Sequence, residues 1–280
     1  MNIYETENKI IIENPENFDL SDIFDCGQCF RFNRIDKNRD HFEGVAFGKY
    51  LRVYQDKTEN KIYFETSLED FNNIWRNFFD IDRDYKYIFE TLRQDEVLRK
   101  ASDFCPGVRI LKQDPFECLI SFIFSQNNNI PRIKKIIERL CENFGDKIIC
   151  GSKNYYAFPS AERIANLALE ELDVLKSGFR AKYIHGAAKK IASGEIDLNA
   201  VYKMPFQEGS EYLQQITGVG KKIAACVLLF AYNKLDAFPI DVWIKRVLEK
   251  YYPEDFDYIK TFGEYAGIAQ EYLYYYERKK

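Results

Sequence analysis

Long hydrophobic runs are absent from this sequence of 280 residues. No apolar stretch reaches the roughly 18 residues that a membrane-spanning helix needs, and the first residues lack the basic and apolar regions of a secretory signal peptide. Low-complexity stretches, internal repeats and long linkers are missing too. Yet 46% of the residues are hydrophobic and 16% are aromatic, enough to fill a sizeable core. We therefore expect a soluble intracellular protein with one large domain or two ordinary ones.

Residues that commonly bind metals are sparse or poorly spaced. The two histidines, His41 and His185, are too few for a histidine-based metal site, and the seven cysteines show no disulfide framework. Cys26 and Cys29 form the only close pair. Four further cysteines are predicted to be small core residues of a reducing compartment: Cys105, Cys118, Cys141 and Cys150. No cysteine cluster suggests an iron–sulfur centre, so we expect none.

An excess of positive charge is also missing, since the formal net charge is −4. Proteins that bind nucleic acids usually carry a basic excess, so the total charge argues against that class. The distribution of charge argues for it, because basic residues crowd the later part of the chain: Lys176, Arg180, Lys182, Lys189, Lys190, Lys221, Lys222, Lys245 and Arg246. A local basic face on an acidic protein is therefore predicted.

The hydrophobic pattern changes period near residue 113. Before that point, four segments are predicted as strands of an antiparallel sheet: Lys9–Glu13, Gly27–Ile35, Phe42–Gln55 and Lys61–Thr66. The segment from Leu68 to about Lys100 is predicted to be helical, and from Asp114 onward the chain is predicted to be helical throughout. We predict an α+β fold with an N-terminal β-rich domain, residues 1–113, and a helical domain, residues 114–280.

The most informative motif is Gly218-Val-Gly-Lys-Lys222, which predicts a helix, a tight turn and a second helix. Glycine at both turn positions leaves the backbone free to adopt positive φ. The first N–H groups of the second helix then point outward without partners and attract an anion such as a phosphate. A plain turn is the alternative for these residues alone.

Pro239-Ile-Asp241 follows at a distance that allows the chain to return from the far end of the second helix. Asp241 is predicted to cap the next helix, which places it beside Lys222 on one side of the molecule. A lysine amine attacks only when it is not protonated, and a helix N-terminus disfavours the ammonium form. Ile223 and Cys226 should face inward on the same helix, so Lys222 is the predicted nucleophile and Lys221 its rival.

Two further features suggest contact with a nucleic acid. Asn127-Asn-Asn129 lies between two apolar helices and could present polar groups to base edges, with Arg132 one turn later. A helix corner is the alternative, because asparagine readily ends helices. Phe179 and Arg180 follow Gly178 and could be a wedge and a base reader. Taken alone, however, Phe179 is more readily explained as a core residue.

Together these motifs resemble the helix-hairpin-helix glycosylases, and the 8-oxoguanine DNA glycosylases in particular. The resemblance spans most of the chain in the order of the family, through the segments Cys26–Arg31, Asp114–Arg132, Gly178–Tyr183, Gly218–Lys222, Pro239–Asp241 and Tyr265–Gln270. It implies excision of 8-oxoguanine paired with cytosine in double-stranded DNA, followed by strand nicking by β-elimination, in base excision repair. We expect a monomer that acts in the cytoplasm or nucleoid of a bacterium, or in the nucleus of a eukaryote, with no membrane partner.

The resemblance also assigns roles to residues. Lys222 would attack the sugar and form a Schiff base, and Asp241 would stabilise the developing cation. The flipped base would be read by the carbonyl of Gly27 and by Gln270, and sandwiched by Cys226 and Tyr274. The orphaned cytosine would be held by three residues and the duplex wedged by a fourth: Asn127, Arg132 and Arg180, and Phe179.

The DNA backbone and a possible ion complete the implied site. Phosphates would bind the amides of Gly218, Gly220 and Ile223, with Trp243 in the position of a phosphate-binding histidine in animal enzymes. No cofactor is required for catalysis, but a structural Na⁺ or K⁺ would bind the main-chain carbonyls of three residues of the hairpin: Gln214, Ile216 and Val219.

Some residues depart from the animal enzymes. Tyr274 replaces a phenylalanine and Phe179 a tyrosine, so strict discrimination for the opposite cytosine is in question. Two other functions remain open: a related glycosylase for another damaged base such as an alkylated purine, and a non-catalytic DNA-binding module. Lys222 and the Gly27 segment argue against the first, and the joint presence of Lys222 and Asp241 argues against the second.

Overall fold

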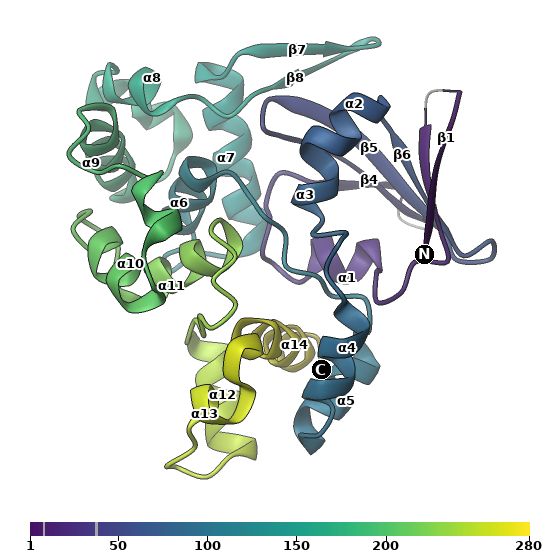
Figure 1. Ribbon diagram of the computed structural model, residues 1–280. Coiled ribbons are helices and arrows are strands. Elements are labelled where there is room, and N and C mark those ends of the chain that lie inside the picture. Colours follow the sequence, from purple (N-terminus) through teal and green to yellow (C-terminus); the bar gives the residue numbers. More distant parts are fainter. Residues whose placement is uncertain (8, 37–38) are drawn as a thin grey trace.

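The computed structural model describes residues 1–7, 9–36 and 39–280, and it contains a six-stranded sheet beside a larger helical part (Figure 1). The strand order is β1-β2-β6-β5-β4-β3, and every neighbouring pair is antiparallel. The strands are β1 (Asn2–Thr6), β2 (Lys9–Glu13), β3 (Asn33–Asp36), β4 (Asp40–Ala46), β5 (Lys49–Asp56) and β6 (Lys61–Glu65). The predicted α+β class is confirmed.

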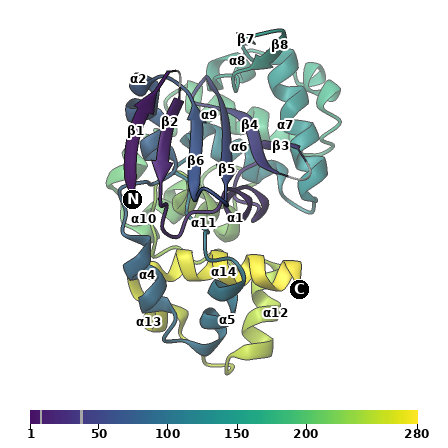
Figure 2. The ribbon, with the colours of Figure 1, turned by 90° about the vertical axis from the view of Figure 1, so that its right-hand side faces the viewer.

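The sheet buries one face under short helices. Ile10, Phe42, Val53 and Phe64 are almost fully buried on that face, together with Trp75. The covering elements are α1 (Leu20–Asp25), α2 (Leu68–Asp70), the π-helix η1 (Phe71–Trp75) and α3 (Arg76–Phe78). Figure 2 shows the strands side by side, and Figure 1 shows α2 and α3 next to the sheet. This apolar core fixes the position of the chain that leaves α1.

One predicted strand is largely wrong. Of the segment Gly27–Ile35, only the last residues enter β3, and residues 27–32 form bends. Gly27 has a φ of 103°, which no strand residue adopts. The side chain of Gln28 bonds main-chain groups there, donating to the Arg109 carbonyl at 2.7 Å and accepting from the Leu111 N–H at 2.8 Å. The strand β1 was not predicted at all.

The helical part surrounds a second and larger core. Its helices are α4 (Tyr85–Leu92), α5 (Glu96–Phe104), α6 (Pro115–Phe124), α7 (Ile130–Phe144), α8 (Ala161–Ala165), η2 (Leu169–Leu175), α9 (Arg180–Ala192), η3 (Ala200–Lys203), α10 (Phe206–Leu213), α11 (Lys221–Phe230), α12 (Val242–Tyr251), α13 (Tyr258–Phe262), η4 (Gly263–Tyr265) and α14 (Ala266–Lys279). Among the helices of the described residues, none is long and apolar enough to cross a membrane.

The expectation of helices throughout the second part is wrong at one place. A two-stranded hairpin, β7 (Lys147–Cys150) and β8 (Lys153–Tyr156), follows α7 and extends along the top of the molecule (Figure 1). Gly151 has a φ of 58° in its turn, a conformation that glycine adopts without strain. Exposure alternates along β7 but not along β8, and four-residue strands are too short for their sequence period to be distinguished from that of a helix.

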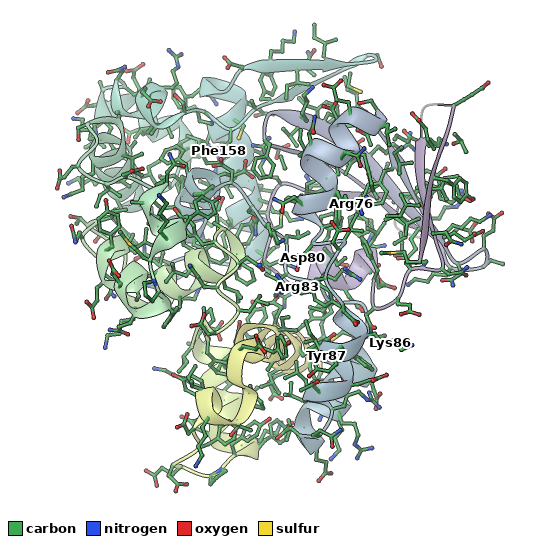
Figure 3. The ribbon with its side chains drawn as sticks, viewed as in Figure 1. Arg76, Asp80, Arg83, Lys86, Tyr87 and Phe158 are labelled. Carbon is green, nitrogen blue, oxygen red and sulfur yellow. The ribbon has the colours of Figure 1, made fainter. Side chains whose placement is uncertain are left out.

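The continuous helical segment predicted from Leu68 to about Lys100 is interrupted at Asp80, which has a φ of 48°. The buried carboxylate of Asp80 pairs with Arg83, lies 2.7 Å from Lys112 Nζ and accepts a hydrogen bond of 3.1 Å from the Tyr85 hydroxyl. Figure 3 shows Asp80 and Arg83 where the chain turns from α3 toward α4. Beyond this turn the chain leaves the sheet.

The helices α4 and α5 belong to the second core, although they precede residue 113. In both ribbon views, α5 lies beside α14 (Figures 1 and 2). Tyr85, Leu98 and Cys105 share the large core with Leu273 and Tyr275 of α14. The predicted domain boundary at residue 113 stays a prediction, but this packing ties the N-terminal half to the last helix. That helix forms one wall of the cavity described next.

Candidate active site

A cavity of about 510 Å³ opens where six parts of the chain meet. They are the turn after α1, the end of α6, the start of α7, the starts of α11 and α12, and one face of α14. The predicted site residues that line it are Gly27, Asn127, Gly218, Gly220, Lys222, Ile223, Cys226, Asp241, Trp243, Gln270 and Tyr274. The volume leaves ample room for an aromatic base and its sugar, and the mixture of apolar walls with few polar groups is typical of a ligand pocket.

The hairpin between α10 and α11 adopts the predicted turn, but the two glycines differ. Gly218 has a φ of 90°, and a Cβ on it would lie 2.6 Å from the ring of Tyr183, so only glycine fits. Gly220 caps α11 in an extended conformation and has open space around it, so the expectation of positive φ there is wrong. No side chain of the described residues caps α11. Its first N–H groups are therefore available to an anion.

The two lysines of the hairpin are separated by their positions on α11. Lys221 is exposed and lies outside the cavity, whereas Lys222 is half-buried and lines it. Lys222 Nζ lies 5.3 Å from the centroid of the Phe122 ring. Ile223 and Cys226 face inward, as predicted. The cavity thus contains one of the two candidate nucleophiles.

Asp241 caps α12 as predicted. Its Oδ1 accepts hydrogen bonds of 2.9 Å from the N–H groups of both Trp243 and Ile244. Because one oxygen takes both capping bonds, Oδ2 remains for the cavity. Beyond the effect of burial, the charges of Asp241 and Lys222 both shift the pKa values of two buried cavity groups, Cys226 and Glu271, with the aspartate raising them and the lysine lowering them. The lysine and the aspartate are therefore close enough to share one bound ligand.

The turn Cys26-Gly27-Gln28 forms the opposite wall and is anchored on both sides. Gln28 holds it from within the core, as described above, and its carbonyl accepts from Gln113 Nε2 at 2.8 Å. Arg278 of α14 donates to the carbonyl of Cys26 and to that of Asp25. A Cβ on Gly27 would lie 2.7 Å from Arg278 Nη1. The φ of 103° at Gly27 also favours glycine, and the hydrogen bonds to the Cys26 and Gln28 carbonyls hold the turn in place.

One face of α14 supplies the remaining polar groups of the cavity: Gln270, Glu271 and Tyr274 line it. Gln270 and Glu271 are 4% and 2% exposed, and each has an Oε1 atom without a hydrogen-bond partner among the described residues. Burial raises the pKa of Glu271 to about 7, and burial raises the pKa of the Cys226 thiol to about 11. Cys226 therefore stays a neutral thiol, an apolar surface for an aromatic ring.

The asparagine run Asn127–Asn129 forms a helix corner and also leaves one polar side chain exposed, the two alternatives that the sequence offered. Asn129 caps α7 by accepting from the Arg132 N–H at 3.0 Å, and Asn128 Nδ2 donates to the Phe124 carbonyl. These two close a helix corner. Asn127 has a φ of 44°, is exposed and lines the cavity. Asn128 also lines the cavity, but its side-chain amide is bonded within the corner, so Asn127 is the exposed member of the run.

Three predicted DNA-contacting residues lie outside the cavity. Arg180 is 4% exposed, and its guanidinium donates to the carbonyls of Gln126 and Asn127. Arg132 is exposed. Burial lowers the pKa of Arg180, and the nearby charge of Arg132 lowers it further. Phe179 is 51% exposed beside this turn, so it is not the core residue that it resembled in isolation. An exposed phenylalanine and two arginines therefore surround Asn127.

The remaining predicted residues occupy the hairpin and the mouth of the cavity. Trp243 lies at the mouth, with the Arg246 guanidinium 4.8 Å from its ring centroid. The carbonyls proposed to hold an ion belong to Gln214, Ile216 and Val219, in the turn between α10 and α11. The Ile216 carbonyl already accepts from the Val219 N–H at 2.9 Å. Carbonyl oxygens are the donors that a hard cation prefers, so the residue types fit.

Among the residues that build the site, sequence reasoning assigned no role to Gln28, Phe122, Glu271 and Arg278, nor to several apolar lining residues such as Phe30 and Ile133. Positions 270, 271, 274 and 278 lie on one helical face, so the spacing from Gln270 could have indicated Glu271 and Arg278. Nothing local marks Gln28 or Phe122, whose roles depend on segments distant in sequence.

Comparisons with known proteins agree with this geometry. Residues 10–119 match the 8-oxoguanine DNA glycosylase N-terminal domain, and residues 120–262 match the HhH-GPD superfamily of base excision DNA repair proteins. The solved structure of the Clostridium acetobutylicum 8-oxoguanine glycosylase/lyase, in complex with double-stranded DNA containing cytosine opposite 8-oxoguanine, is 39% identical. It superposes with a TM-score of 0.92 over 100% of this chain and 98% of that chain.

Two curated relatives are more distant. An N-glycosylase/DNA lyase of Saccharomyces cerevisiae is 29% identical over 85% of this chain and 69% of its own length. A DNA-3-methyladenine glycosylase of Bacillus subtilis is 28% identical over 86% of this chain and 85% of its own length.

Proposed function

The chain belongs to the 8-oxoguanine DNA glycosylase family of helix-hairpin-helix enzymes, and on that premise we propose that it excises 8-oxoguanine from duplex DNA and then nicks the strand. The observation that carries the proposal is the placement of Lys222 and Asp241 at one cavity. Each comes from the start of a different helix. An N-glycosylase and DNA lyase needs both a nucleophile and a carboxylate at the sugar.

The proposed reaction follows from these positions. The damaged nucleotide rotates out of the duplex and its base enters the cavity, between Cys226 and Tyr274. The unprotonated Lys222 amine attacks C1′ of the sugar, and the base leaves with the electrons of the glycosidic bond. Asp241, through its free oxygen, stabilises positive charge as it develops on the sugar. The departing nucleobase takes up a proton, and the amine nitrogen loses its protons as the C1′–O4′ bond opens, so that a Schiff base forms at C1′. Removal of a C2′ proton then breaks the C3′–O bond, and the 3′ phosphate leaves.

Opposite-base recognition is proposed at the turn around Asn127. Phe179 would enter the gap left by the extruded nucleotide, and Arg132 would reach the orphaned cytosine. Arg180 would act indirectly, since its guanidinium already holds the carbonyls of Gln126 and Asn127. The phosphates beside the lesion would bind the first N–H groups of α11.

Borohydride trapping tests the proposal, with duplexes that carry 8-oxoguanine opposite each of the four bases. A covalent adduct that is lost in Lys222→Gln supports the lysine chemistry, and its yield ranks the opposite bases. Base release without an adduct would instead indicate a glycosylase that uses water.

A second function, excision of alkylated purines, is favoured by the similarity to the 3-methyladenine glycosylase. A panel of duplexes with 8-oxoguanine, 3-methyladenine or 7-methylguanine separates the two. Preferred release of the alkylated bases would replace the first proposal.

A monovalent cation is proposed at the hairpin carbonyls of Gln214, Ile216 and Val219. It would stabilise the phosphate-binding turn and would take part in no chemical step. Replacing K⁺ by tetramethylammonium at constant ionic strength should lower the melting temperature if the ion binds there.

A further inference from the structure

We propose that Glu271 is a further base-binding residue, whose unpaired carboxylate oxygen accepts a hydrogen bond from an N–H group of the extruded purine. This inference rests on the proposed function and extends it. Nothing in the comparisons assigns a role to this position.

The position of Glu271 places its side chain at the wall of the cavity in which the base would bind. Residues 270, 271 and 274 occupy adjacent positions on one face of α14, and all three line the cavity. Glu271 is 2% exposed, so bulk water does not solvate it. Its Oε1 atom has no hydrogen-bond partner among the described residues. A buried carboxyl oxygen without a partner is costly unless a ligand or a bound water completes it.

The groups around Glu271 keep it near the point of ionisation. Burial raises its pKa to about 7, while the Cys26 thiol, Arg278 and Lys222 oppose that shift and Asp241 adds to it. Three other titratable groups also interact with its charge: Cys105, Cys226 and Tyr274. An N–H donor from a bound base stabilises the ionised form over the protonated one. Base binding and ionisation of Glu271 should therefore favour each other.

The chemistry of the other polar groups makes an N–H donor the matching partner. The Gly27 carbonyl and the unpaired Gln270 Oε1 are both acceptors. Glu271 adds a third acceptor next to Gln270. A guanine-derived base carries N–H groups on its pairing edge, and 8-oxoguanine carries another at N7. Three acceptors in one cavity select a purine with several N–H groups over one that offers lone pairs.

The experiment compares two activities of the same holoenzyme. The first is single-turnover excision of 8-oxoguanine opposite cytosine, and the second is strand nicking at a preformed abasic site in the same duplex. Only the first requires a base in the cavity, whereas both require Lys222. For Glu271→Ala, we expect excision to fall about tenfold or more while nicking stays within twofold. Glu271→Gln keeps one acceptor oxygen and should lie between the two.

The pH profile provides an independent readout. In the unmodified protein, the ratio of excision to nicking should rise as the pH increases from 6 to 8, because the ionised carboxylate is the better acceptor. In Glu271→Gln the ratio should be flat. Dividing the two rates removes the shared dependence on Lys222. Glu277→Gln is the matched control on α14, since Glu277 pairs with Lys250 and does not line the cavity.

Several outcomes would overturn the proposal. Unchanged excision in both variants would remove Glu271 from base binding. An equal loss of excision and nicking would make it a support of the reactive centre instead. If Glu271→Ala fails to fold, the nearly isosteric Glu271→Gln decides through the pH profile. An unmodified protein that nicks abasic sites but releases no 8-oxoguanine would overturn the substrate proposal and this one together, whereas loss confined to the variants tests Glu271 alone.

Discussion

Arg278, near the end of α14, donates a hydrogen bond of 3.0 Å to the main-chain carbonyl of Cys26, the residue before Gly27. The same guanidinium donates to the Asp25 carbonyl and lies 3.1 Å from the Tyr274 hydroxyl. One side chain thus connects the turn that should read the base with the ring that should stack on it. The hydroxyl of Tyr274 has a structural role as part of this connection, which a phenylalanine at this position would lack.

Replacing Arg278 tests that connection. Arg278→Met keeps the length of the side chain but loses its hydrogen bonds, and bonds from a charged donor to buried groups contribute about 1.5–3 kcal/mol each. We expect the KM for 8-oxoguanine duplexes to rise about tenfold or more and the melting temperature to fall. Lys279→Met, an exposed neighbour on α14, is the control. Equal kinetics for the two variants would remove Arg278 from base positioning.

The choice between the two hairpin lysines is directly testable. Lys222→Gln should abolish excision and nicking but preserve lesion binding, because the hairpin amides that would grip phosphate remain. Lys221→Gln should retain both activities and lose only some affinity, in a salt-dependent way. Trapping and gel-shift assays measure the two properties separately. Activity that survives in Lys222→Gln and disappears in Lys221→Gln would reverse the assignment.

Asp241→Asn separates the two roles of this residue. Asparagine caps helices about as well as aspartate, so α12 should form and the melting temperature should change little. The loss of negative charge at the sugar should slow single-turnover excision by roughly a hundredfold, about 3 kcal/mol in the barrier. An unchanged rate would leave Asp241 with a capping role only.

Arg132 provides the test of opposite-base recognition. It is exposed on the first turn of α7, where its N–H group is capped by Asn129 of the asparagine run. Arg132→Ala should reduce the preference for opposite cytosine by about 1–3 kcal/mol, the contribution of a bidentate contact to a base. Excision rates opposite cytosine, adenine, guanine and thymine give the profile, and Lys135→Ala on the same helix is the control. A profile that does not change would exclude Arg132 as the reader.

The buried Glu117 predicts a pH dependence of stability. Burial raises its pKa to about 7, although Arg31 Nη1 lies 3.8 Å away. Between about pH 4.5, the usual pKa of a glutamate, and about pH 7, the folded state therefore keeps a proton on Glu117 that the unfolded state has released. The stabilisation is complete below about pH 4.5 and is lost as the pH rises to about 7, by up to about 3 kcal/mol.

Glu117→Gln should reduce this loss, since an amide does not ionise. Urea unfolding at pH 5 and pH 8 measures it, and the exposed Glu142→Gln is the control. Asp22 and Glu271 have pKa values raised to about 7 in the same way, so part of the slope should remain. An identical slope in the variant would show that Glu117 ionises freely in the folded protein.

Much of the reactive centre could be predicted from sequence because its signals are local. A Gly-Val-Gly turn, a helix cap and an inward-facing helix side place Lys222 and Asp241 within short segments. The turn at Gly27 could not be predicted as a turn, because long-range hydrogen bonds of Gln28 and Arg278 override the alternating apolar pattern that follows it. The β7–β8 hairpin was missed for a related reason, since four-residue strands carry almost no periodic signal.

The reactive pair and the base-contacting wall come from different parts of the chain. Lys222 and Asp241 belong to consecutive helical segments, whereas the wall is assembled from residues 25–28 and one face of α14. In terms of protein engineering, this wall can be exchanged without altering the segments that carry Lys222 and Asp241, while Cys226 on α11 stays common to both parts. Exchanging residues 25–28 together with positions 270, 271, 274 and 278 should change which base the cavity binds. Nicking at a preformed abasic site should persist in such variants, and its rate then shows whether the variant is folded.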